Sequence, residues 1–141
     1  DEYGLAPLVA QQVASVAVAS LGQVPALFAD GAGRVMAGRV DPRDQRVRQW
    51  ERQLSQSPLG RFSVEDFLAG KLPPEQQEAL NFALVKSLAG NPQRYQGLLA
   101  QIRQGVAFDQ AFARIYGATP QATLSAWIGR PAALAPNNRR R

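Results

Sequence analysis

Residues 8–36 decide the fold, and they read LVAQQVASVAVASLG, then a glutamine, then VPALFADGAGRVM. The first part places apolar residues at helical spacing without a charge, which predicts a helix over residues 6–21. Gly22 interrupts this pattern, and Pro25 suits the start of a second helix that ends by Gly38. Because the first helix is apolar on nearly every side, we expect the rest of the domain, a missing preceding segment or a partner protein to cover it.

The remainder of the chain also shows helical periodicity, and no long stretch alternates with the period of a strand. The two tryptophans, Trp50 and Trp127, fall on apolar stripes and are expected in the core. The fold class is therefore all-α, with about seven helices and short connections. After the second helix, the expected helices span about residues 42–56, 63–69, 73–88, 92–104, 108–117 and 120–128, and their expected N-caps are Asp41, Ser63, Asn91 and Thr119.

A chain of 141 residues is one domain by length and can bury a substantial core. We assign residues 1–130 to the helical domain. Residues 131–141 are rich in Pro, Ala, Asn and Arg and are expected to form a flexible basic tail.

The chain contains neither cysteine nor histidine. The first absence excludes disulfides, a thiol nucleophile and a cysteine-based metal site. The second removes the commonest zinc ligand and the usual general base near neutral pH. The sequence therefore predicts neither a metal nor another cofactor. Prolines, glycines and glutamines interrupt the long uncharged run, which favours a buried core helix over a membrane span.

The formal net charge is +5, and nearly all of the 16 basic residues are arginines. A solvated basic surface is the simpler interpretation, and an acidic protein, a nucleic acid or an anionic membrane is the alternative partner. Acidic residues interrupt the main cluster, which argues against nucleic acid. The candidate basic patch consists of Arg34, Arg39, Arg43, Arg46, Arg48 and Arg52.

Two segments of the chain, VAQQVAS at residues 9–15 and PALFADGA at residues 25–32, resemble the active-site region of the peptidase MA-like gluzincins. Active members of this bacterial family carry His-Glu-x-x-His on one helix and a third zinc ligand, a Glu, on the next. Two His residues four positions apart reach one ion, and the Glu between them polarises the metal-bound water.

The resemblance implies a degenerate zinc site. Gln11 stands at the first His, Gln12 at the catalytic Glu and Ser15 at the second His, while Asp30 stands at the ligand Glu. Asp30 could still bind a metal, but neutral Gln and Ser side chains are weak zinc ligands. From the residues alone, ordinary hydrogen bonds are the simpler expectation for the two glutamines, and a new binding pocket at this place is the alternative. For Asp30 the simpler expectation is a helix-terminus role or an arginine partner.

The later segments at residues 79–85, 94–99, 105–112 and 116–120 follow the order of the same family's helical subdomain, so the resemblance spans roughly residues 5–129. In that family a β-rich part precedes this subdomain, and the present chain begins without it. The resemblance implies a non-catalytic pseudo-metallopeptidase. It would serve as an accessory subunit or scaffold in a larger extracytoplasmic or periplasmic assembly, which could be membrane-associated.

Two other functions stay open at this point. A hydrolase could use a non-standard carboxylate site built from Asp30, Glu65 or Asp66, although no spacing places these residues together. A basic helical module could bind a nucleic acid or another anion through the arginine cluster.

Overall fold

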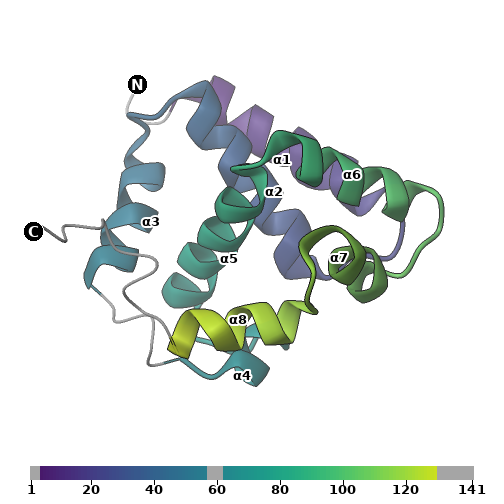
Figure 1. Cartoon of the computed structure of the whole chain (residues 1–141). Coiled ribbons are helices and arrows are strands. Elements are labelled where there is room, and N and C mark those ends of the chain that lie inside the picture. Colours follow the sequence, from purple (N-terminus) through teal and green to yellow (C-terminus); the bar gives the residue numbers. More distant parts are fainter. Residues whose placement is uncertain (1–3, 57–61, 130–141) are drawn as a thin grey trace, which may run out of the picture.

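The computed structural model describes residues 4–56 and 62–129, and within these ranges the chain forms eight α-helices and no strand (Figure 1). The predicted all-α class is thus confirmed. The predicted tail at residues 131–141 and the domain end at residue 130 lie outside these ranges. The helices are α1 (Leu5–Ala19), α2 (Ala26–Val40), α3 (Gln45–Gln56), α4 (Val64–Leu68), α5 (Pro74–Ala89), α6 (Pro92–Arg103), α7 (Phe108–Tyr116) and α8 (Pro120–Gly129).

Three of the four expected N-caps are confirmed, because their side chains accept backbone N–H bonds from the first turn. Ser63 accepts from Asp66 N at 3.2 Å, and Asn91 accepts from Arg94 N at 3.1 Å. The hydroxyl of Thr119 accepts from Ala122 N at 3.1 Å. These bonds satisfy donors that have no partner inside the helix, so they fix where α4, α6 and α8 begin.

The predicted cap at Asp41 is wrong. The side chain of Asp41 accepts from Arg43 N at 3.0 Å and so closes a short turn between α2 and α3. Asp44 starts α3 instead, since its Oδ1 accepts from Arg46 N at 2.8 Å and its carbonyl accepts from Arg48 N at 3.1 Å. Pro42 lies in this turn, and α3 begins at Gln45, three residues after the predicted start at residue 42.

Helix α5 forms the centre of the domain, where α2, α3 and α6 pack around it (Figure 1). Its side chains Leu80, Leu84, Val85 and Leu88 are buried, as the sequence predicts. Phe28 from α2 and Phe112 from α7 complete the main core. A smaller cluster joins α3 to α5, with the rings of Trp50 and Phe82 5.3 Å apart.

Two glycines of α2 let this helix approach its two neighbours closely. A Cβ atom at Gly31 would overlap the carbonyl oxygen of Asn81 in α5. On the α1 side, a Cβ atom at Gly33 would lie 2.5 Å from the carbonyl oxygen of Gln11 and 3.1 Å from Cβ of Ser15. Helix α2 is therefore in backbone contact with α5 and with α1.

Candidate functional site

The four residues that the resemblance aligns with a zinc motif do not converge on one point. Gln11 is buried, and its Oε1 accepts a hydrogen bond of 2.8 Å from Nη1 of Arg46 in α3. Ser15 lies on the same face of α1, against Gly33. Gln12 is exposed to solvent on another side of the helix. The closely packed α1–α2 contact occupies the space that a metal would need between the two helices.

Asp30 is paired with an arginine, which is one of the roles that the sequence suggests for it. Its Oδ2 accepts from Nε of Arg34 at 2.7 Å and from Nδ2 of Asn81 at 2.8 Å. Gln77 donates in turn to Oδ1 of Asn81 at 3.0 Å and to the carbonyl oxygen of Phe67 at 3.1 Å. The carboxylate is thus part of a polar network that joins α2 to α5 and to the end of α4.

These residues do not fit a zinc site. Gln11 and Ser15, which the resemblance aligns with the zinc-binding His residues, have neutral side chains. The carboxylate of Asp30, which it aligns with the ligand Glu, is paired with Arg34. Within residues 4–56 and 62–129, no group of three or more His, Cys, Asp or Glu side chains could hold a metal ion.

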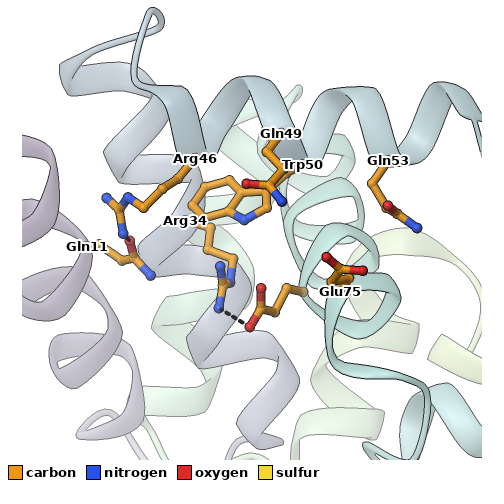
Figure 2. A pocket seen from close by; sticks show the side chains of 8 residues that line it. Gln11, Arg34, Arg46, Gln49, Trp50, Gln53 and Glu75 are labelled. Atoms are coloured by element: carbon orange, nitrogen blue, oxygen red, sulfur yellow. Dashed lines mark hydrogen bonds and ion pairs between the residues drawn. The ribbon is translucent and has the colours of Figure 1, made fainter. Parts of the chain in front are cut away.

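Trp50 is buried as predicted, and two arginines lie over its ring. The guanidinium carbon of Arg34 is 4.7 Å from the ring centroid, and that of Arg46 is 5.8 Å away. Both arginines also have carboxylate partners, Glu78 at 3.6 Å from Arg34 and Asp44 at 3.3 Å from Arg46. Figure 2 shows both guanidinium groups close to Trp50, with Gln11 beside Arg46.

A polar cavity of about 290 Å³ opens at this cluster (Figure 2). Its arginines are already paired with carboxylates, and its remaining groups are mostly amides, so it offers hydrogen bonds without a strong excess of either charge. Such a lining suits the recognition of a polar partner. The cavity is lined by Gln11, Arg34, Arg46, Gln49, Trp50, Gln53, Glu75 and Glu78.

The six arginines of the predicted basic patch divide into two sets. Arg34 and Arg46 are partly buried and line the cavity. The other four are exposed, on α2, α3 and the turn between them. The second set consists of Arg39, Arg43, Arg48 and Arg52.

The most exposed apolar surface is on α1, on the side that faces away from α2. The buried side chains of this helix are Pro7, Gln11 and Val18, so its inner side is partly polar. We call the opposite side the outer face of α1. Its exposed apolar side chains are Leu5 (68% exposed), Val13 (62%), Val16 (62%), Val9 (50%) and Leu8 (40%).

The sequence signalled this face only in part. The uncharged, all-round apolar helix was expected to need a cover, but the sequence did not show which side would stay open. Gly33 gives only half of the missing signal, because its lack of a Cβ atom marks the side of α2 that α1 approaches and not the side of α1.

Comparisons of the chain with protein-family models, with curated proteins and with solved structures find no match. Among the helices of the described residues, none is both long enough and apolar enough to cross a membrane.

Proposed function

We propose that this chain is a non-catalytic protein-interaction module and that the outer face of α1 is its docking surface. One observation carries the proposal: five apolar side chains lie exposed along a single helix. Single exposed apolar residues are common on monomers, whereas a contiguous apolar surface usually marks an interaction site. The proposed role is that of an accessory subunit or scaffold.

The non-catalytic part of the proposal is supported by the positions of the degenerate motif. Gln11 accepts from Arg46 of α3 at 2.8 Å and Asp30 accepts from Asn81 of α5 at 2.8 Å, so both side chains serve the packing of the helices. In line with the gluzincin resemblance, we propose that the chain is a pseudo-metallopeptidase and part of an extracytoplasmic assembly. A membrane-associated complex is one form that such an assembly can take.

The substitution Val13→Glu tests the docking surface, because it places a charge in the middle of the outer face. If the face is free in the purified protein, the protein binds an apolar-surface dye and the variant binds less. If a partner covers the face, the variant releases that partner. Ser87→Glu, at an exposed position of α5, is the matched control and should leave both readings unchanged.

A compact monomer that binds no dye, with Val13→Glu indistinguishable from it, would overturn the docking surface. Metal analysis tests the non-catalytic part separately. Stoichiometric zinc in the purified protein, together with peptidase activity that a chelator removes, would overturn it.

A further inference from the structure

The outer face of α1 has a regular central line. Leu5, Val9, Gln12 and Val16 follow one another at intervals of four, three and four residues, and all four are exposed. This is the spacing of the a and d positions in a coiled-coil heptad, which lets a second helix lie along the whole line. We call these four residues the α1 seam. Leu8 and Val13 flank the seam on either side.

The charge of the region allows a second copy of the same chain to approach. Each copy carries a net charge of +5, yet residues 4–29 contain no charged side chain. Two copies that meet through α1 therefore bring no like charges together at the contact. An identical surface on both sides is also the requirement of a two-fold symmetric interface.

Gln12 is the single polar residue of the seam, and it favours its own copy as a neighbour. An amide has both donors and an acceptor, so two Gln12 side chains that face each other can bond reciprocally. An apolar partner helix or a lipid surface would leave this amide without a hydrogen bond. A single polar residue in an apolar seam also fixes the register of the two helices.

The size of the surface is compatible with a dimer. The five exposed apolar side chains of α1 make a patch on the order of 500 Å² in each copy, and two such patches together reach the roughly 1,000 Å² expected of a specific interface. Met36 and Val40, on the last two turns of α2, are further exposed apolar side chains.

We propose that the partner of the α1 seam is a second copy of this chain, bound as a parallel two-fold pair of α1 helices. This inference rests on the proposed docking function and names its occupant. The parallel arrangement follows from Gln12, because an antiparallel pair that overlaps the whole seam would set Gln12 against Val9, whereas a parallel pair in register sets it against its own copy. Valine at the a positions with leucine at a d position suits a pair of two strands. In this pair each seam residue, Gln12 included, meets its own copy.

Disulfide trapping in the full chain tests the geometry, because the protein has no cysteine of its own. Under mild oxidation, Gln12→Cys and Leu5→Cys should each give a covalent dimer, since both positions meet their copies across the two-fold axis. Ser87→Cys is the exposed control and should stay uncrosslinked. A dimer from Gln12→Cys but none from Leu5→Cys would overturn the parallel arrangement.

Charge pairing tests the occupant. The double variant Val9→Glu/Val16→Glu should be monomeric by sedimentation at concentrations where the unmodified chain is dimeric. The variant Val9→Lys/Val16→Lys should also be monomeric, and an equimolar mixture of the two should restore the dimer. Circular dichroism of each variant checks that it is folded.

The remaining outcomes separate this inference from the proposed function. A wild-type monomer that binds an apolar-surface dye would overturn the second copy as the occupant, while the docking surface would stand. A wild-type monomer that binds no dye would overturn both.

Discussion

Helices α1 and α5 are similar in length, and α1 has the larger share of apolar residues, but their surroundings are opposite. Helix α5 packs against α2, α3 and α6, and its apolar side chains are buried. Helix α1 packs chiefly against α2, and it buries Gln11 while five apolar side chains stay exposed.

The contrast shows that burial depends on how many neighbours a helix has as well as on its apolar content. At the backbone contact with Gly33, the side of α1 that carries Gln11 and Ser15 faces α2. Within residues 4–56 and 62–129, no other helix packs extensively against α1.

The largest expected difference comes from the same substitution in the two helices. Leu84→Ala in α5 removes a side chain that is 2% exposed and should lower the free energy of unfolding by about 2–5 kcal/mol. Leu5→Ala in α1 removes one that is 68% exposed and should change it by about 0.5 kcal/mol or less. Urea denaturation at low protein concentration measures both. Equal losses would show that α1 is covered in the monomer.

The two glycines of α2 should respond unequally to alanine. A Cβ atom at Gly31 meets the backbone of α5, which other helices hold in place, so Gly31→Ala should cost about 3 kcal/mol. Gly33→Ala should cost about 1 kcal/mol, because α1 can move away from α2.

Gly38→Ala is the control for this pair, since its Cβ atom would make only an ordinary contact, 3.5 Å from Cγ1 of Val47. The control should raise stability by about 0.5 kcal/mol, because alanine favours the helix. Thermal denaturation of the three variants gives the order. A cost at Gly33 as large as that at Gly31 would mean that α1 is held as firmly as α5.

A smaller difference in stability is expected between the hydrogen bonds that attach α5 and those that attach α1. Asp30→Ala leaves Arg34 and Asn81 without their shared acceptor between α2 and α5, and it should cost about 2 kcal/mol. Gln11→Ala removes the bond from α1 to Arg46, whose guanidinium keeps Asp44, and it should cost about 1 kcal/mol. Chemical denaturation at neutral pH compares them, and the reverse order would contradict the network described for Asp30.

The smallest expected effect is a decrease in the free energy of unfolding at alkaline pH. It arises from Tyr116, which contacts α5. Burial raises the pKa of Tyr116 to about 12 from its ordinary value of 10.0, with Tyr95 adding to the rise and Arg94 opposing it. The hydroxyl of Tyr116 donates to the carbonyl oxygen of Leu88 in α5 at 3.1 Å. The folded state therefore favours the protonated phenol.

The stability from this group is fully present below pH 10.0 and is lost as the pH rises toward 12. Unfolding measured from pH 8 to 11 should show a decline that is weaker in Tyr116→Phe. An identical decline in both proteins would assign it to other groups. Helix α1 has no titratable side chain, so its own packing should add nothing to this decline.

Much of the fold could be predicted from local signals. Apolar spacing gives the helices, and Ser63, Asn91 and Thr119 mark helix starts because a capping side chain acts within three residues. The error at Asp41 is instructive, since two aspartates near Pro42 compete and only the turn geometry selects Asp44.

The site was less predictable because its contacts join distant parts of the chain. Asn81 donates to Asp30 across 51 residues of sequence, and Gln11 accepts from Arg46 across 35. An arginine was among the partners expected for Asp30. No pattern in the sequence identifies Asn81 as the second donor. For the same reason, the basic cluster looked like one surface although two of its members turn inward over Trp50.

The single-sided attachment of α1 also has a consequence for local opening. A helix held mainly by one neighbour can detach without unfolding the rest, so its backbone amides should exchange with solvent deuterium sooner than those of α5. We therefore expect a slowly exchanging centre and a first helix that opens separately. Occupation of the α1 seam would close this opening, and slower exchange confined to residues 5–19 would report it.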